Sequence, residues 1–568
     1  MAKKSRDFLV TDAETDPFKP GRVPQPFIWG LYNGRTEEYD EHKTGADVCE
    51  AVRERKVVVY AHNGGKFDFH YIRDQINTDD PIMVIGGRLA KFKVGDAEFR
   101  DSMNILNEPL KVFQKEDIDY GKLEANVRDQ HMDEIRRYLR SDCVNLWNTV
   151  DSYFTRFGRT LTQAGASMRY WTKHYEVPWI RQSMHQAARY RDYYYGGRVE
   201  CFESGYSGRR FEVVDKNSAY PDAMCARHPI SPDAEFERHL PPAGEMGPAL
   251  IRVEGIAKGC FPWRNPDDNG SLLFPDDERT IREYCVTGWE LEAALEHDAF
   301  KIFDVKEVRR FSQTVDFRDY ILGFYEMRKE AKRNGDKLGD LFAKRFMNSL
   351  YGKFASDPAK YAEYAIASDE TLAHWCGACD SRKCYICKSG KPKIEEHPYA
   401  RLNSWGDRHL CARPLPDWKH TYYNVATAAS ITGYVRAELY KAMQKCSGVM
   451  YCDTDCIAAR DVSRLPQGPE LGEWKLEGRF DEYAMAGKKL YAWRYAENSA
   501  DGKHKRGEYK TASKGVRLEA PDIIRVSKGE VVTYHPEVPT YYVEKGPEFV
   551  SREIRMTHKK VAPEAISA

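Results

Sequence analysis

Alternating apolar and polar positions predict short strands and helices along the whole chain. Strands are expected at 8–10, 56–60 and 211–214, where β-branched or aromatic residues run into acidic or amide residues. Over 133–151 the apolar residues recur every three or four positions, which predicts a helix. The pattern therefore indicates mixed α and β structure.

Two hairpins are expected further along. The runs 320–333 and 337–350 have helical spacing, and the Asn-Gly-Asp between them is a turn signal, so they predict an antiparallel helical hairpin. The runs 448–451 and 456–459 read as strands, and Asp-Thr-Asp lies between them. This second pair predicts a β-hairpin with carboxylates at its tip.

Composition limits the class of protein without naming it. At about 150 residues per domain, 568 residues suggest about four domains. Lys plus Arg and Asp plus Glu both total 87, which argues against a uniformly basic coat protein but allows a local basic groove. We expect no membrane span, because no apolar run reaches about 18 residues. The 14 cysteines, and an N-terminal apolar stretch too short for a signal peptide, favour a reducing cytoplasm.

A first set of carboxylates falls in the N-terminal quarter. Asp12 and Glu14 share one face of a strand end, Asp68 follows the next strand, and Tyr138 and Asp142 share one face of a helix. A lone D-x-E is usually a solvated strand end. Four carboxylates and a phenol in this order predict a site that holds two metals and a water for phosphodiester hydrolysis.

These motifs, D-x-E, N-x(3)-F-D and Y-x(3)-D, resemble those of the DEDDy 3′–5′ proofreading exonucleases of family B DNA polymerases. The resemblance implies that the four carboxylates bind the metals and that Tyr138 orients the attacking water. It also implies single-strand DNA contacts by His62, Asn63, Phe67 and Ser102, the last from an Asp-Ser-Met stretch that resembles D-S-L but has Met in place of Leu. Lys115 would stabilise the phosphate, with an ordinary surface charge as the alternative.

A second set of residues lies in the second half of the chain. Asp215 follows a strand and Asp455 belongs to the predicted hairpin tip, so carboxylates from different strands can bridge two magnesium ions. Between them, Lys344, Asn348 and Tyr351 lie at i, i+4 and i+7 and share one helix face. Lys344 is a point charge suited to nucleotide phosphates.

This set resembles the family B polymerase motifs D-x(2)-S-x-Y-P, K-x(3)-N-S-x-Y-G and Y-x-D-T-D. By resemblance, Asp215 and Asp455 bind the metals and Asp453 supports them. Tyr220 would exclude a 2′-hydroxyl, and Tyr351 would stack near the new base pair. On the first helix of the hairpin, Arg328 and Lys332 would join Lys344 on the triphosphate, with a solvated helix face as the alternative.

Further motifs resemble the protein-primed branch of family B, and the stretch 61–69 resembles tectivirus-type polymerases. Asp12 lies close to the N-terminus, which implies the branch without an extra N-terminal domain. The resemblance implies template contacts by the Y-x-G-G residues Tyr194, Gly196 and Gly197 and by Thr432 and Arg436, and primer contacts by Lys489 and Tyr491.

The fold class expected from this resemblance is a multidomain α/β and α+β chain. An N-terminal RNase H-like DEDDy exonuclease domain would be followed by a right-hand polymerase with two insertions. The expected ranges are exonuclease 1–175, palm 176–221 and 422–478, fingers 318–352 and thumb 479–568. A terminal-protein-docking insertion would occupy 222–317, and a processivity and strand-displacement insertion 353–421.

Two C-x-x-C pairs in the second insertion are not explained by the polymerase motifs. Cys376, Cys379, Cys384 and Cys387 have the spacing of a small tetrahedral zinc site. Free cysteines and an iron–sulfur cluster are the alternatives. None of these would be catalytic.

The predicted function is a template-directed DNA polymerase with 3′–5′ proofreading and strand displacement that replicates a linear genome from a terminal-protein primer. It would need two Mg²⁺ or Mn²⁺ per active site, bind DNA and dNTPs, and act as a monomer in the cytoplasm. The alternatives are a polymerase that extends ordinary primers or needs none, and a nuclease or DNA end-binding protein with an inactive palm. An RNA polymerase or reverse transcriptase is disfavoured by Tyr220.

Overall fold

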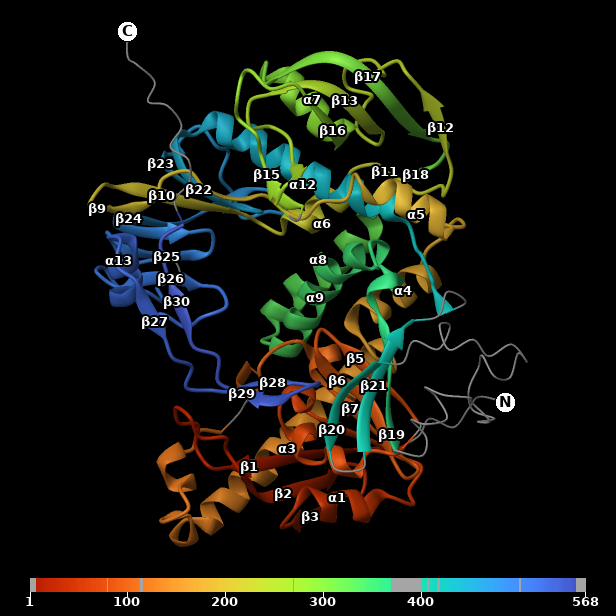
Figure 1. Ribbon diagram of the computed structural model, residues 1–568, viewed down its shortest axis with the longest axis vertical. Coiled ribbons are helices and arrows are strands. Elements are labelled where there is room, and N and C mark those ends of the chain that lie inside the picture. The colour runs from red at the N-terminus through yellow and green to blue at the C-terminus, as the bar shows by residue number, and fades with distance from the viewer. Residues whose placement is uncertain are drawn as a thin grey trace. The chain divides into compact units, whose positions relative to one another are not determined.

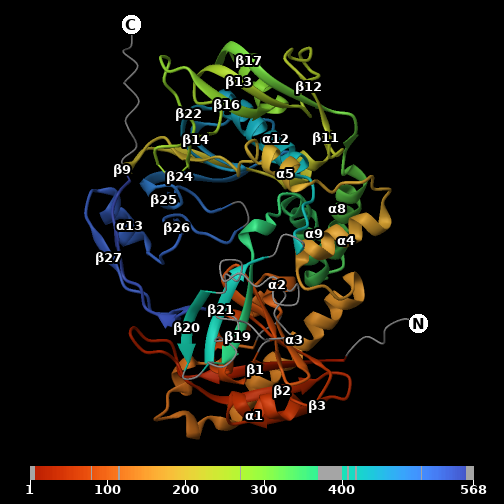
Figure 2. The same cartoon turned by 45° about the vertical axis from the view of Figure 1, so that its right-hand side comes forward.

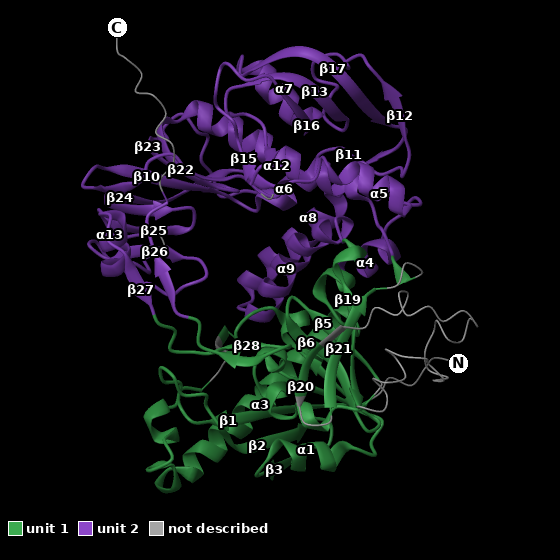
Figure 3. Ribbon diagram, in the orientation of Figure 1, with its two compact units in different colours: residues 1–166, 357–420, 535–550 green, residues 167–356, 421–534, 551–568 purple. Residues whose placement is uncertain are grey.

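The computed structural model (Figure 1) describes residues 7–78, 80–112, 116–268, 270–368, 400–405, 408–415, 419–499 and 502–557. The chain forms two compact units, each assembled from separate stretches of sequence (Figure 3). Unit 1 comprises 1–166, 357–420 and 535–550, and unit 2 comprises 167–356, 421–534 and 551–568. Within the described ranges, no helix is both long and apolar enough to cross a membrane.

Unit 1 contains a ten-stranded sheet with strand order β20-β21-β19-β5-β6-β7-β4-β1-β2-β3. Its strands are β1 (Phe8–Thr15), β2 (Pro26–Asn33), β3 (Glu38–His42), β4 (Val58–Ala61), β5 (Pro81–Ile85), β6 (Arg88–Val94), β7 (Ala97–Asp101), β19 (Ala362–Ser368), β20 (Ala400–Trp405) and β21 (Arg408–Pro414). The central strands β1, β4 and β7 are parallel, and the other pairs are antiparallel. Every residue of β4 is buried, as its β-branched run predicts for a strand inside a sheet.

The long helix of unit 1 places two of the predicted catalytic side chains. The helices are α1 (Gly45–Val52), α2 (Met103–Leu106) and α3 (Met132–Phe157). One stripe of α3 is buried and packs on β1 and β2, and Trp147 stacks on Phe8 with ring centroids 5.0 Å apart. This confirms the helix expected at 133–151. Tyr138 and Asp142 belong to the buried stripe, so both face the sheet.

Two late stretches of the chain complete unit 1. β19 pairs with β5 through Tyr364 and Ile82, and thereby brings β20 and β21 onto the sheet. The hairpin β28 (Thr540–Tyr542) and β29 (Gly546–Glu548) belongs to the same unit. Parts of the sequence that were expected to form an insertion and a thumb are thus grouped with the N-terminal unit.

Unit 2 is organised around an antiparallel sheet. Its strand order is β26-β25-β24-β10-β23-β22-β8, and β9 pairs with β24. The strands are β8 (Val199–Cys201), β9 (Gly205–Ser207), β10 (Phe211–Lys216), β22 (Ser447–Asp453), β23 (Cys456–Asp461), β24 (Trp474–Gly487), β25 (Leu490–Tyr495) and β26 (Tyr509–Ser513). The strand and the β-hairpin expected here are confirmed, with β10 lying between β23 and β24.

Helices and a small C-terminal layer surround this sheet. The helices are α5 (Met184–Arg191), α6 (Ala219–Met224), α8 (Arg318–Arg333), α9 (Lys337–Phe354), α12 (Val425–Lys445) and α13 (Ala520–Ser527), and α4 (Gln163–His174) precedes them along the chain. The strands β27 (Val532–Tyr534) and β30 (Arg552–Ile554) pair with each other. The expected helical hairpin is confirmed as α8 and α9, which turn at Asn334 and Gly335, where Gly335 has a φ of +68°.

The predicted insertion at 222–317 forms a smaller sheet of order β12-β17-β13-β16. Its elements are β11 (His228–Pro229), β12 (Ala234–Glu237), β13 (Leu250–Ala257), β14 (Trp263–Asn265), β15 (Ser271–Leu273), β16 (Arg282–Thr287), α7 (Gly288–Glu296), β17 (Phe300–Phe311) and β18 (Thr314–Val315). Figure 2 shows α12 running beside this sheet, and α7 and β16 contact α12. The contact is close at Gly433, where an added Cβ would lie 2.3 Å from Thr287 Oγ1.

Candidate active sites

The structure brings the predicted exonuclease carboxylates together in unit 1. Ligand oxygens of Asp12, Glu14 and Asp142 all lie within 4.8 Å of one another, and Asp68 lines the same cavity of about 430 Å³. Strand β1 supplies the first two residues from one face, and α3 supplies Asp142. Asp68 begins a single 3-10 turn, so three elements converge on one point.

Burial raises the pKa values of acidic groups in this site. Asp68 is 3 % exposed, and burial raises the pKa of its carboxyl well above the ordinary value, with the charge of Asp12 adding to the rise. Burial and the charges of Asp142 and Glu14 likewise raise the pKa of Tyr138, so its phenol stays protonated. Clustered hard oxygens of this kind suit a divalent cation, which would favour their ionised forms. The donor set therefore fits magnesium or manganese.

Three of the predicted DNA contacts line this cavity, and one does not. His62, Asn63 and Phe67 are at its wall. Ser102 is fully buried, and its Oγ lies 3.0 Å from His62 Nδ1 and donates to the carbonyl oxygen of Ala61. The expected direct contact of Ser102 with DNA is therefore not supported, because the side chain is covered. Ser102 instead fixes the ring of His62.

Arg88, which belongs to none of the sequence motifs, stabilises the loop that contains Asn63 and Gly65, beside the carboxylates. Arg88 Nη1 donates to Asn63 Oδ1 at 3.0 Å and to Asp101 Oδ2 at 2.7 Å. The same Asp101 oxygen accepts from the backbone N–H of Gly65 at 3.2 Å. Asn63 has a left-handed φ of +59°, so this network stabilises a backbone conformation that few residues adopt.

The cavity also has aromatic walls that the sequence motifs missed. Phe18 lies 5.6 Å from Phe67, Tyr541 lies 5.3 Å from it, and Tyr120 completes the wall, the distances joining ring centroids. Phe18 and Tyr120 are 44 % and 56 % exposed, so both rings are accessible at the cavity. Lys115 lies outside the described residues.

The second set of carboxylates meets in unit 2. Asp215, at the end of β10, stands opposite Cys456 in the ladder, and Lys216 N–H donates to the carbonyl of Asp455 at 2.7 Å. Burial and the charge of Asp455 raise the pKa of Asp215 to about 7. Burial, with the charge of Asp453 adding to it, raises the pKa of Asp455 to about 6. Two carboxyls with raised pKa values fit a site completed by divalent cations.

The third acid of this site is already paired. Asp453 forms an ion pair with Lys489 and accepts from the hydroxyl of Tyr451 at 3.3 Å. The backbone of Lys489 is in the left-handed region, with a φ of +56°. Tyr491 stacks on Trp493 with ring centroids 3.7 Å apart. Lys489 thus contacts the acid directly, in addition to the primer contact expected of it.

The predicted nucleotide residues lie on two helices. Tyr220 of α6 and Tyr351 of α9 stack at 4.2 Å with their ring planes 8° apart. Lys344 is exposed on α9. Arg328 pairs with Asp340 at 2.7 Å across the hairpin, and its expected contact with the triphosphate stays a prediction. Lys332 is exposed.

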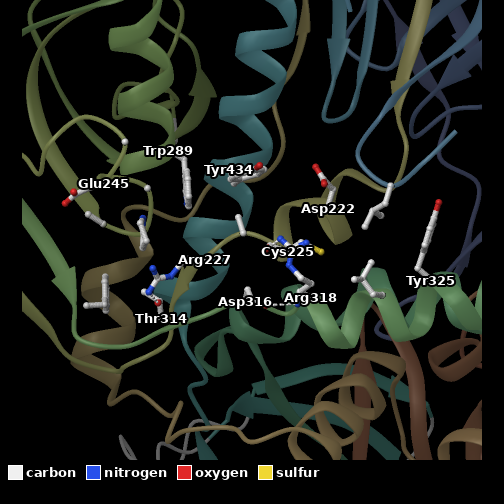
Figure 4. Close-up of a pocket in the computed structure, with 18 of the residues that line it drawn as sticks. Asp222, Cys225, Arg227, Glu245, Trp289, Thr314, Asp316, Arg318, Tyr325 and Tyr434 are labelled. Carbon is white, nitrogen blue, oxygen red and sulfur yellow. Dashed lines mark hydrogen bonds between the residues drawn. The ribbon is translucent and has the colours of Figure 1, made fainter. Parts of the chain in front are cut away.

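Helix α8 is attached at two places, to the end of α6 and to the loop between β23 and β24, and its residues line a cavity of about 1230 Å³. At the start of α8, Arg318 donates to the carbonyl of Cys225 at 3.2 Å (Figure 4). Further along, Tyr325 and Lys329 reach Glu470 at 3.4 and 3.2 Å. Figure 4 shows Trp289 and Tyr434 on the opposite wall from Tyr325. This cavity is lined by none of the predicted catalytic carboxylates.

Two predicted template contacts, Thr432 and Arg436, are buried. They are 1 % and 2 % exposed, and Thr432 donates to the carbonyl of Ala429. A covered side chain does not reach a template strand, so direct DNA contact by this pair is not supported. Of the Y-x-G-G residues, Gly196 is exposed, while Tyr194 and Gly197 are half-buried.

Comparison with known proteins defines the class. Residues 108–448 match the family model described as DNA polymerase type B, organellar and viral. Phi29 DNA polymerase in complex with primer-template DNA and incoming nucleotides has the same fold, with a TM-score of 0.71, 18 % identity, and coverage of 97 % of this chain and 100 % of that one.

The curated relatives agree with that class. The DNA-directed DNA polymerase of Enterobacteria phage PRD1 is 32 % identical over 96 % of this chain and 97 % of its own length. A DNA polymerase of Bacillus phage Nf is 23 % identical over 71 % of this chain and 69 % of its own. The chain therefore belongs to the organellar and viral type B DNA polymerases, a family that uses divalent metals, and it is a DNA-directed DNA polymerase.

Proposed function

We propose that this polymerase joins nucleotides at Asp215 and Asp455 and removes mispaired primer ends at Asp12, Glu14, Asp68 and Asp142. These carboxylates would hold divalent cations, which would supply the charge that activates the attacking oxygen and neutralises the leaving one. DNA template, primer strand and dNTPs are the partners that such chemistry requires.

At the polymerase site, the protein orients the reactants. The exposed ammonium of Lys344 is suited to the triphosphate, and the Tyr220–Tyr351 stack forms a flat wall for the sugar and the new base pair. Lys489 holds Asp453 in an ion pair, so that acid supports the turn that carries Asp455.

At the exonuclease site, the protein holds the strand end. The half-buried ring of Phe67 and the exposed rings of Phe18 and Tyr120 offer stacking surfaces, which bind bases without regard to sequence. The protonated hydroxyl of Tyr138 lies beside Glu14 and Asp142, where it can orient an attacking water.

One observation carries the proposal: a single type B polymerase chain contains two separate carboxylate clusters, each with an acid whose pKa is raised by partial or full burial. A nuclease with an inactive palm would have no need of a pair such as Asp215 and Asp455. The stack beside Tyr220 disfavours ribonucleotides and hence an RNA polymerase.

The test uses a 5′-labelled primer on a longer template, magnesium, and a strand annealed downstream, with and without dNTPs. We expect extension through the downstream strand, and shortening when dNTPs are left out. Asp455→Ala should abolish extension and keep shortening, whereas Asp12→Ala should do the reverse. Shortening without extension in the unchanged protein would overturn the replicative proposal.

A more specific proposal is that a terminal protein serves as the primer. Its support is the small sheet of 222–317, whose Phe236 and Phe303 are 51 % and 49 % exposed, and the likeness to phage polymerases. We expect action as a monomer in the host cytoplasm on a linear genome. A covalent protein–nucleotide adduct with the terminal protein would support this, and initiation on bare template would contradict it.

The four cysteines 376, 379, 384 and 387 lie outside the described residues, and we propose that they bind one structural zinc. The support is their sequence spacing. Metal analysis of the purified protein should give one zinc per chain, lost in Cys376→Ser/Cys379→Ser. An iron-containing or metal-free protein would contradict this assignment.

A further inference from the structure

The Y-x-G-G segment (Tyr194–Gly197) touches the turn that carries the polymerase carboxylates. A Cβ added at Gly197 would lie 2.4 Å from Thr454 Oγ1, so only glycine fits there. The next residue, Arg198, accepts a hydrogen bond from the N–H of Thr454 at 2.7 Å through its carbonyl. Thr454 has a φ of +61° and is the centre of the D-T-D turn. The position of the segment therefore constrains the turn.

The other side of the segment is held by an arginine from the insertion 222–317. Arg264 of β14 donates from Nη1 to the carbonyl of Asp192 at 3.1 Å and from Nη2 to the carbonyl of Tyr194 at 2.5 Å. Its guanidinium also lies 4.2 Å from the ring centroid of Tyr195. Because the planar guanidinium of Arg264 bridges two backbone carbonyls and also stacks on a ring, it fixes both the position and the orientation of this backbone segment.

A buried ion pair adds a second attachment. Arg436 of α12 pairs with Glu290 of α7 at 2.7 Å, and the two side chains are 2 % and 1 % exposed. Arg436 Nη1 also donates to the carbonyls of Tyr195 at 2.7 Å and Gly196 at 2.9 Å. Glu290 thus fixes the arginine that binds the segment, which explains why Arg436 is buried.

Three more contacts come from the same insertion. Arg252 of β13 reaches Asp192 Oδ2 at 3.3 Å, and the buried Tyr193 donates to Glu307 of β17 at 3.4 Å. Arg198 lies 4.3 Å from the ring centroid of Phe274. Residues before, within and after the Y-x-G-G segment all contact the insertion.

We propose that the insertion 222–317 is a positioning element of the polymerase site: it holds the Y-x-G-G segment against the D-T-D turn through Arg264 and through Glu290 acting on Arg436. The inference rests on the proposed polymerase site at Asp215 and Asp455. The insertion acts on these carboxylates through the turn. A partner bound to the insertion would therefore alter nucleotide addition as well as local docking.

Arg264 is the sharper probe, because it is exposed and its loss leaves no buried charge unpaired. We expect Arg264→Ala to lower kcat for extension about tenfold, since small misplacements of reacting groups are costly. Affinity for primer-template and the degradation of single-stranded DNA should change less than twofold. Arg264→Lys keeps the charge but loses the planar fork, so it should stay as slow as Arg264→Ala.

Arg310→Ala is the matched control, because Arg310 is an exposed arginine of the same insertion and pairs with Glu237 at 3.7 Å. It should extend primers at the normal rate. Full activity in Arg264→Ala, or rescue by Arg264→Lys, would overturn the proposal, the latter by pointing to simple attraction of DNA.

A second variant tests the buried ion pair between Glu290 and Arg436. Glu290→Gln keeps the shape but weakens the pair with Arg436, and its thermal unfolding midpoint reports whether it folds. A folded Glu290→Gln with normal kcat would also count against the proposal. Asp455→Ala tests the proposed polymerase site itself. If this variant still extends primers, the site is wrong, whatever the activity of Arg264→Ala.

Discussion

Tyr541 lies edge-on to Phe67, with ring centroids 5.3 Å apart, although the two residues come from opposite ends of the chain. Its hydroxyl lies 2.6 Å from that of Tyr71, which in turn donates to the carbonyl of Pro24. A C-terminal residue therefore forms a wall of the cavity that contains the N-terminal carboxylates.

Removing this wall should weaken degradation without affecting synthesis. We expect Tyr541→Ala to slow the degradation of single-stranded DNA about tenfold, because the buried ring of Tyr541 supports Phe67 and the stacking of a base on such a ring contributes about 1–3 kcal/mol. Tyr541→Phe keeps the ring and should retain most of the activity. The measurement is the loss of a 5′-labelled oligonucleotide with time.

Tyr542→Ala serves as the control, because its ring is not part of the cavity wall. Equal losses in Tyr541→Ala and Tyr542→Ala would mean that the hairpin acts only through general stability.

Arg88 should matter for both stability and degradation. In Arg88→Ala the fully buried carboxylate of Asp101 loses its cation, which costs about 3 kcal/mol of unfolding free energy. Burial already raises the pKa of Asp101 and Arg88 opposes that rise. Without Arg88 the folded pKa rises further above the unfolded value, so the loss should shrink as the pH falls and the carboxyl becomes neutral.

Chemical unfolding at pH 7.5 and pH 5 checks this expectation. Lys91→Ala, which removes a partly exposed ion pair of 3.9 Å on the same strand, should cost less than about 1 kcal/mol. An Arg88→Ala penalty that is small, or independent of pH, would contradict the account.

Tyr220 should control sugar selection. Its ring stacks on Tyr351 at 4.2 Å and, in the proposed site, forms the wall for the sugar, so Tyr220→Val should open space for a 2′-hydroxyl. We expect the preference for dNTPs over rNTPs to fall about 100-fold, within the range that pocket shape alone provides. Single-nucleotide incorporation gives both kcat/KM values. Tyr220→Phe keeps the ring and should discriminate normally, and a loss there would point to the hydroxyl instead.

His228 should make unit 2 sensitive to acid. It is fully buried between Ser430 Oγ at 2.9 Å and the carbonyl of Ala223 at 2.7 Å, and burial lowers its pKa to about 4. The unfolded pKa is near 6.5, so the unfolded state binds the extra proton first as the pH falls, and stability is lost below about pH 6.5.

Between pH 7.5 and 5 this histidine should account for about 2 kcal/mol of lost stability. His228→Gln does not titrate, so the gap in unfolding free energy between the unchanged protein and the variant should narrow by that amount. A gap of constant size would exclude the histidine as the source.

Sequence reasoning reaches the residues whose chemistry is encoded locally. Asp12 with Glu14, and Tyr138 with Asp142, share a face by strand and helix periodicity alone, and the structure places them accordingly. The D-T-D turn follows from two flanking apolar runs. Both helices of the hairpin follow from spacing and a turn signal.

Residues placed by long-range packing are not predictable in this way. Arg436 was expected at the DNA because its motif resembles a template contact, but its burial depends on Glu290, far away in the sequence. Nothing local marks Tyr541 as part of an N-terminal cavity. The pairing of β19 with β5 likewise depends on a register that no short pattern encodes.

Unit 1 is built from residues 1–166, 357–420 and 535–550, and this has a consequence for synthesis on the ribosome. The carboxylates emerge first, yet Tyr541, which completes their cavity wall, emerges almost last. While the intervening chain is made, Phe67 and its neighbours lack that cover. For most of translation, the nascent chain therefore contains the exonuclease carboxylates without the residue that completes the wall of their cavity. A chain released early by the ribosome would contain these carboxylates but lack Tyr541.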